Sequence, residues 1–144
     1  RARGARPVSS DRSLRLEAVV SSMRASDHGR MEAIIAGRFW HAHHVDVCRR
    51  NGFVAVTGGD ESITVALALP LDAGTVALPI EVTPANALLV VGEEVLSANG
   101  ERGHGAIVVR HLTRHRLAGS FTLLLAGSTP ILVQVTNGSF DVPL

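Results

Sequence analysis

The histidines at positions 41, 43 and 44 are the residues whose type and spacing could most directly support chemistry, as ligands of a metal ion. In an extended chain His41 and His43 project from one face, because alternate residues of a β-strand point to the same side. Two imidazoles at this spacing can bind zinc or copper once further ligands join them. Those ligands would have to be a carboxylate or one of Cys48, His104, His111 and His115.

No second motif of fixed spacing accompanies this histidine pair. The alternative interpretation is a solvent-facing strand edge that happens to be rich in histidine. We therefore expect no metal and no other cofactor, with His41 and His43 as the candidate ligands if a metal does bind.

The run R-H-L-T-R-H-R at residues 110–116 is the second chemically distinctive stretch. It places Arg110, Arg114 and Arg116 around two histidines, just before an apolar strand pattern. One interpretation is a cationic hairpin tip that contacts an anion or an acidic partner. The other is a solvated loop tip without a partner.

Residues that would support catalysis are missing from the pattern. There is no G-x-S-x-G nucleophile turn, and no predicted strand has a carboxylate on its apolar face. Asp60 and Glu61 follow Gly58-Gly59, in a predicted turn. The glycines at 100, 103 and 105 lead into a strand rather than a helix, so they lack the helix N-terminus that binds phosphate. We expect a protein that is not an enzyme.

Charge divides the chain into a basic arm and a mildly acidic body. Residues 1–30 contain seven arginines and three acids, a net charge of +4, whereas residues 31–144 contain seven arginines and ten acids, a net charge of −3. Aromatic residues make up 3% of the chain, which disfavours binding of single-stranded nucleic acid. The predicted partner-contact residues are Arg1, Arg3, Arg6, Arg12, Arg15, Arg110, Arg114 and Arg116.

The fold class follows from about ten short runs with β-type patterning, separated by turn residues at roughly ten-residue spacing. In residues 62–69 the side chains of Ile63, Val65, Leu67 and Leu69 alternate onto one face. The sequence predicts an all-β domain over residues 31–144, an antiparallel sandwich or barrel. Residues 1–30 form the basic arm, within which residues 14–23 fit either a short helix or a strand.

Two local features refine this prediction. Asn51-Gly52 predicts a tight hairpin turn, because both residues tolerate positive φ. The predicted strand Phe39–Cys48 has Trp40 on one face and Val45 on the other, so either its phase slips near His43, as at a β-bulge, or both of its faces are buried. Trp40 is predicted to be buried.

Several motifs in order resemble a family of uncharacterised small bacterial secreted and lipoprotein β-domains. The opening M-E-A-I-I-A-G-R-F-W-H-A at residues 31–42 and the ending V-T-N-G-S-F-D-V-P at residues 135–143 match it best. Further matches are V-T-G at 56–58, G-T-V-A-L at 74–78 and L-A-G-S-F at 117–121. The resemblance implies an antiparallel β-domain of the bacterial envelope and no known activity. The chain departs from the family at residues 87–91, where members often have aromatics.

We therefore expect a non-enzymatic envelope domain on the periplasmic side, its leader already removed, that acts by protein contact. It would be an accessory or stabilising subunit of a larger assembly, in one version a membrane complex. One alternative is a carrier of a small ligand or lipid inside a barrel, and another is a metal-binding protein or enzyme using His41 and His43. A cytoplasmic location is the less favoured alternative, because the resemblance implies the envelope. The lone Cys48 allows either compartment.

Removal of residues 1–12 tests the role of the arm. This segment holds four arginines and almost no apolar residue, so it can add little to a core. We expect the truncated protein to keep its melting temperature while it binds its native assembly or anionic vesicles more weakly. Raising the salt concentration on the full chain should have the same effect. Equal binding of both proteins at low salt would show that the arm is only a linker.

Overall fold

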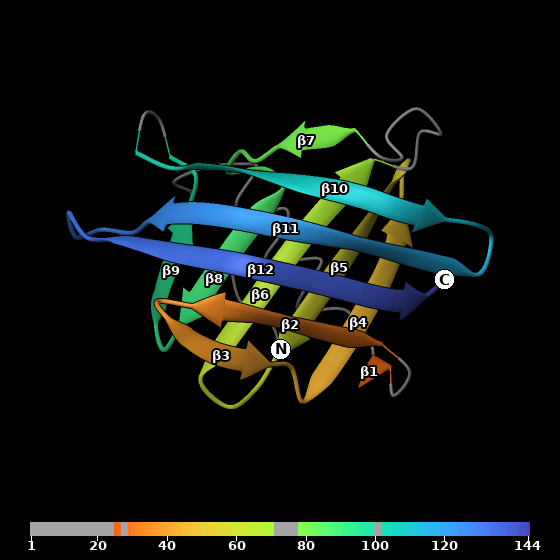
Figure 1. Ribbon diagram of the computed structural model, residues 1–144, viewed down its shortest axis with the longest axis horizontal. Coiled ribbons are helices and arrows are strands. Elements are labelled where there is room, and N and C mark those ends of the chain that lie inside the picture. Colours follow the sequence, from red (N-terminus) through yellow and green to blue (C-terminus); the bar gives the residue numbers. More distant parts are fainter. Residues whose placement is uncertain (1–24, 27–28, 71–77, 100–101) are drawn as a thin grey trace, which may run out of the picture.

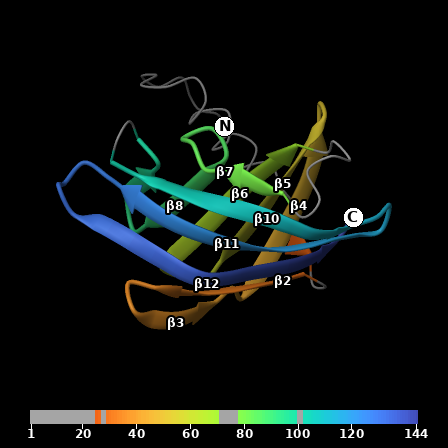
Figure 2. The same cartoon turned by 45° about the horizontal axis from the view of Figure 1, so that its top comes forward.

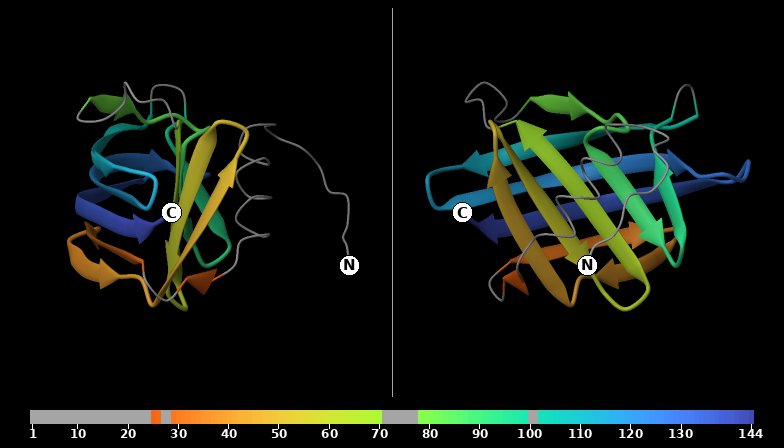
Figure 3. Two further views of the ribbon diagram at one scale, coloured as in Figure 1. Left: turned by 90° about the vertical axis from the view of Figure 1, so that its right-hand side faces the viewer. Right: turned by 180° about the vertical axis from the view of Figure 1, so that it is seen from behind.

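The architecture, seen in a computed structural model that describes residues 25–26, 29–70, 78–99 and 102–144, is all-β and antiparallel. The strands form one curled sheet, a half-barrel, whose two halves face each other as layers (Figures 1 and 3). The described residues contain no helix, and hence none that is long and apolar enough to cross a bilayer. The predicted fold class is confirmed.

The front layer of Figure 1 contains the strands that carry the candidate site. In chain order they are β2 (Arg30–Ile35), β3 (Arg38–His41), β7 (Pro79–Glu81), β10 (His104–Leu112), β11 (Arg116–Ala126) and β12 (Leu132–Pro143). The spatial order is β7-β10-β11-β12-β2-β3. The longest two, β11 and β12, lie at the centre and pair along nearly their whole length.

The back layer crosses behind the front layer at an angle, as Figure 2 also shows. Its strands are β4 (His44–Arg50), β5 (Phe53–Gly59), β6 (Ile63–Pro70), β8 (Ala87–Val91) and β9 (Glu94–Ser97), with β1 (Ala25–Ser26) at the β4 edge. The far end of β11 runs past β10 and pairs with β9 through Ala126 and Ser97, which joins the two layers.

The core lies between the layers and consists almost entirely of aliphatic side chains. The alternation predicted for β6 is confirmed, since Val65, Leu67 and Leu69 are fully buried in this core. Trp40 is also buried, with 5% of its surface exposed, whereas its strand neighbour Phe39 is 68% exposed. The predicted burial of Trp40 is therefore correct.

The alternation of inward and outward side chains changes phase near His43 because the chain passes there from the front layer to the back layer. This corrects the prediction of one strand over residues 39–48. The front-layer strand β3 ends at His41, and the back-layer strand β4 begins at His44. Between them the Ala42 N–H donates to the Met31 carbonyl, at 2.9 Å, and the His43 N–H donates to the Gly59 carbonyl, at 2.8 Å. This corner turns Trp40 and Val45 into the same core from opposite layers, so neither a bulge nor a doubly buried strand is needed.

Other strand boundaries differ less from the prediction. The runs predicted at residues 131–136 and 139–142 form the single strand β12, with a register shift between Thr136 and Ser139. The strand β7 was not predicted. The run predicted at 75–78 lies almost wholly outside the described residues, as do the arm and the segment 14–23. At the predicted Asn51-Gly52 turn, φ is +49° and +85°, as that turn type requires.

Two glycines in the centre of the front layer make room for two phenylalanines. The sequence Gly-Ser-Phe occurs at 119–121 and again at 138–140, and β11 and β12 pair these triplets antiparallel. Gly119 therefore lies opposite Phe140, and Phe121 lies opposite Gly138. The two rings point into the core with centroids 6.3 Å apart. Each ring covers the glycine on the neighbouring strand, an arrangement that protects a glycine within a sheet.

Substitution Gly138→Ala tests this packing. A Cβ at position 138 would lie 2.6 Å from Cζ of Phe121, so the ring would have to move within a filled core. We expect a loss of roughly 1–3 kcal/mol in the free energy of unfolding. The neighbouring change Ser139→Ala, on the exposed face, should cost less than about 0.5 kcal/mol. Equal effects in urea denaturation would contradict the proposed fit of ring and glycine.

Candidate functional site

The register of the front layer gathers four residues into one line across its outer face. Arg30 on β2 pairs with Asp141 on β12, Asp141 pairs with Ala118 on β11, and Ala118 pairs with His111 on β10. Paired residues of antiparallel strands project to the same side, so these side chains share one face. The small side chain of Ala118 lies in the middle of the line.

A β-bulge adds Arg110 to the same face. The pairing of β10 with β11 shifts between Val109 and His111, which leaves Arg110 as the extra residue. Val109 points into the core, and Arg110 and His111 are then both exposed. Without this extra residue, strict alternation would place only one of them outside. Two basic side chains therefore leave β10 at nearly the same place.

Arg116 forms the strongest polar contact at the site, with Asp141. Its Nε donates to Oδ1 at 2.9 Å and its Nη2 donates to Oδ2 at 2.7 Å, a two-pronged contact on the diagonal between β11 and β12. The hydrogen bonds from Arg116 are the main cause that lowers the pKa of Asp141. The positive charges of Arg30 and His111 lower that pKa further. The same contact raises the pKa of Arg116.

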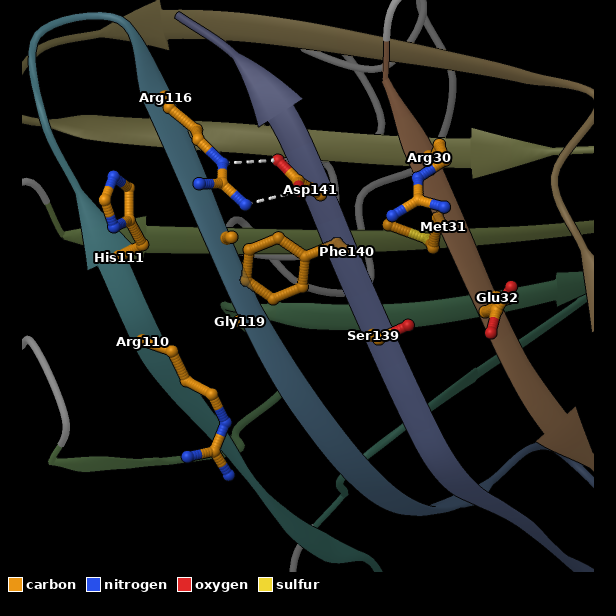
Figure 4. A pocket seen from close by; sticks show the side chains of 11 residues that line it. Arg30, Met31, Glu32, Arg110, His111, Arg116, Gly119, Ser139, Phe140 and Asp141 are labelled. Carbon is orange, nitrogen blue, oxygen red and sulfur yellow. Dashed lines mark hydrogen bonds and ion pairs between the residues drawn. The ribbon is translucent and has the colours of Figure 1, made fainter.

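These side chains surround a half-open pocket of about 360 Å³ on the outer face of the front layer (Figure 4). Basic groups from β2, β10 and β11 stand around it. Its other lining residues include Ser139 and Glu32, and Gly119 with Phe140 underneath. We call this pocket the basic groove, defined by Arg30, Arg110, His111, Arg116, Ser139 and Asp141.

Two guanidinium groups of the basic groove have unused donors. Within the described part of the chain, Arg116 alone forms an ion pair in the groove, and neither Arg30 nor Arg110 has a carboxylate within ion-pair distance. The Ser139 side chain is exposed between them. The groove can therefore accept a further anionic group without first breaking the Arg116–Asp141 contact.

The arginines predicted for partner contact fall into three groups: two in the basic groove, one in a turn and five outside the described residues. Arg110 and Arg116 lie in the basic groove, on β10 and β11. Arg114 is exposed in the turn that joins these strands, where the Thr113 side-chain Oγ1 accepts the His115 N–H at 3.2 Å. The five predicted arginines of the arm, at positions 1, 3, 6, 12 and 15, lie outside the described residues.

The histidine pair lies at the edge of the front layer, where His41 on β3 pairs with Glu32 on β2, a residue that lines the pocket. The rings of His41 and His43 are neighbours, with centroids 5.3 Å apart, and Phe39 lies 5.9 Å from His41. Among residues 29–70, 78–99 and 102–144 no group of three or more histidine, cysteine or acidic side chains is arranged to hold a metal. Cys48 is half-buried on the back layer and is a free thiol.

Asp60, which the sequence places in a turn, stabilises that turn with its side chain. Its Oδ1 accepts the N–H groups of Ser62 and Ile63, both at 2.8 Å, between β5 and β6. These two hydrogen bonds are the main cause that lowers the pKa of Asp60. Glu94, the first residue of strand β9, accepts the Ser128 N–H at 3.1 Å and so connects β9 to the β11–β12 connection.

Sequence reasoning did not identify Arg30, Ser139 and Asp141 as site residues. Arg30 was counted with the basic arm, and the other two were assigned to a terminal strand. One signal was available: the repeated Gly-Ser-Phe triplet predicts that Ser120 and Ser139 meet on the face opposite the rings. That face also receives Asp141, two residues after Ser139.

No protein-family model matches the chain, and searches of the curated proteins and of the solved structures found no significant match. The resemblance to secreted and lipoprotein β-domains therefore stays a hypothesis. The geometry of the basic groove is therefore the main indication of function.

The lowered pKa of Asp141 gives a measurable pH dependence. Because the folded-state pKa lies below the value of about 3.9 in an unfolded chain, Asp141 stabilises the fold above that pH. This contribution is lost as the pH falls through the lower folded-state pKa. We expect Arg116→Gln to raise the pKa of Asp141 in a carboxyl NMR titration and to leave Asp60 unaffected. An unchanged Asp141 midpoint would contradict the role assigned to Arg116.

Proposed function

We propose that this protein is a non-enzymatic accessory subunit that acts by protein contact, and that the basic groove binds an acidic segment of its partner. The main support for this proposal is that Arg30, Arg110 and Arg116, from three different strands, line one exposed pocket. Asp141 engages only the last of them in an ion pair.

The Arg116–Asp141 ion pair within the basic groove is an example of the kind of contact that we propose with the partner. A guanidinium group presents parallel N–H donors that fit a carboxylate, and Asp141 binds Arg116 in this way. Glutamate or aspartate side chains of a partner can make the same contact with Arg30 and Arg110. The pocket is half-open and lies on a strand face, which suits an extended acidic segment better than an enclosed small molecule.

For the compartment we propose the periplasmic side of the bacterial envelope, within an assembly that includes membrane proteins. The support is the resemblance of residues 31–143 to secreted and lipoprotein domains and a single cysteine that requires no particular redox state. The basic arm would add contacts to the same assembly or to the anionic membrane surface.

No specific observation favours either of the two other hypotheses, the ligand carrier and the metal-binding protein or enzyme. A carrier would need a cavity inside the half-barrel, but the side chains that would line it, among them Leu67, Leu89 and Phe121, pack against one another in the core. A metal protein would need further ligands beside His41 and His43, and no group of three or more histidine, cysteine or acidic side chains is arranged to hold a metal in the described part of the chain. Protein contact therefore remains the proposed function.

The double substitution Arg30→Ala with Arg110→Ala tests the proposal. We expect it to weaken binding of the native partner about tenfold, since two exposed charged contacts are lost, and to leave the melting temperature almost unchanged. The measurement is quantitative co-purification from native membranes, supported by titration with a hexaglutamate peptide.

The matched control is Arg49→Ala with Arg50→Ala, which removes the same charge from two exposed positions at the end of β4. If the control weakens binding equally, net charge and not the groove decides the interaction. If neither double variant changes binding, the basic groove is not the contact surface.

A further inference from the structure

The strand β3 leaves one edge of the front layer open. It is the last strand in the order β7-β10-β11-β12-β2-β3, and among the described residues it pairs with β2 alone. Figures 1 and 2 show it as the outermost strand of that layer. An open edge presents backbone N–H and C=O groups with which another extended chain can pair.

The pairing with β2 determines which backbone groups of β3 point outward. The N–H of Ala42 donates to the Met31 carbonyl, at 2.9 Å. Because hydrogen-bonded pairs alternate with non-bonded pairs along antiparallel strands, the backbone of every second residue before Ala42 also faces β2. The N–H and C=O groups of Phe39 and His41 therefore point to the open edge. None of these four groups has a backbone partner in the described part of the chain. We call this edge, with the side chains of Arg38, Phe39 and His41, the β3 edge.

The opposite edge of the front layer is built differently. Its last strand, β7, begins with Pro79, which has no N–H, and ends with the exposed acid Glu81. Proline and charge in an edge strand hinder pairing with another chain. β3 contains neither a proline nor an acid, and its one formal charge is Arg38, next to the hairpin turn. The β3 edge is therefore the more accessible of the two to an added strand.

An exposed aromatic side chain lies at the β3 edge. Phe39 has 68% of its surface exposed, whereas Trp40, Phe121 and Phe140 are at most 5% exposed. The ring of His41 lies beside it, with centroids 5.9 Å apart. Phe39 therefore contributes little to the core, and aromatic side chains in such positions are enriched where proteins meet.

The charge of the β3 edge indicates the chemistry of its partner. From β3 to the start of β4 the chain contains Arg38 and three histidines, and no acid. Two acids lie near the far end of β3: Glu32 pairs with His41, and the Asp60 carboxylate, which accepts two N–H groups of its turn, is close enough to His43 to be influenced by its charge. Arg38, at the hairpin end, has no carboxylate within ion-pair distance in the described part of the chain. A second copy would add more positive charge to this edge, whereas an acidic segment complements Arg38.

We propose that the β3 edge binds an extended segment of a partner protein as an additional β-strand, with an apolar side chain against Phe39 and an adjacent acidic side chain against Arg38. Arg38 and Phe39 project to opposite faces of the sheet, so two consecutive residues of an added strand meet them in turn. The backbone groups of Phe39 and His41 supply hydrogen bonds that any sequence can make, and the two side chains supply selectivity. This contact does not depend on the basic groove, which lies on the outer face over β2, β10 and β11.

A hexapeptide of alternating glutamate and valine is the probe, and fluorescence anisotropy of the labelled peptide measures its binding. We expect Phe39→Ser to weaken binding about tenfold, because the apolar anchor is lost, and to leave the melting temperature almost unchanged. The matched control is Ile131→Ser, which removes an apolar side chain that is also 68% exposed, before β12. The control should bind the peptide as the original chain does. Equal effects of the two substitutions would contradict the role of Phe39.

A second measurement uses the unaltered protein and changes the backbone of the peptide. One version has methyl groups on the amide nitrogens of the valines, the other on those of the glutamates. An added strand pairs with β3 through one of its edges only, so one version should lose binding at least thirtyfold and the other should stay within about threefold of the unmodified peptide. If both versions bind equally, or lose binding equally, the peptide is not an added strand and the proposal fails.

Two further outcomes separate this proposal from its alternatives. In the variant Arg30→Ala with Arg110→Ala the peptide should still bind in a way that depends on Phe39, so a failure of the basic groove and a failure of the β3 edge give different results. Analytical ultracentrifugation of the protein alone examines self-association. A dimer that Phe39→Ser converts to a monomer would show that the β3 edge binds a second copy, and would overturn the proposal.

Discussion

The reciprocal packing of two phenylalanines on two glycines is the constraint on which the front layer depends. Because Gly119 faces Phe140 and Gly138 faces Phe121, the register of β11 and β12 cannot slip by one residue without placing rings on the solvent face. These strands are also the longest, and β11 alone pairs with β10, β12 and β9. The fit between rings and glycines therefore fixes the position of nearly every other strand in that layer.

The basic groove is a direct consequence of the same register. With the rings inside, Ser120, Ser139, Ala118 and Asp141 must point outward, and small side chains there leave a hollow between β10 and β2. The bulge at Arg110 then adds one more cation than strict alternation would allow. The groove and this part of the core thus lie on opposite faces of the same strand pair, β11 and β12. A substitution that shifts the rings should disturb the groove, whereas one confined to the groove should leave the core unchanged.

The two layers differ in what they present outward. The outer face of the front layer has arginine, serine and acidic side chains, while the outer face of the back layer has a small apolar cluster of Ala55, Ala66 and Leu88. Polar groups on an exposed sheet face remain hydrated, so the front layer is stable without a bound partner. Apolar groups on such a face are stable only when covered. The proposed partner contact at the basic groove agrees with this asymmetry, because the outward side chains of the groove are the polar and charged ones.

The fold class, the burial of Trp40 and the turn at Asn51-Gly52 could be predicted from the sequence, because these depend on alternation and on backbone preferences within a few residues. The sequence also marked Arg110 and Arg116 as potential contacts. Their meeting with Arg30 and Asp141 depends on the tertiary structure, since strand order and register bring Arg30 beside residues that lie 80 or more positions further along the chain. The corner at Ala42–His43 was likewise invisible in the sequence. A phase change looks the same whether a strand bulges or the chain moves from one layer to the other.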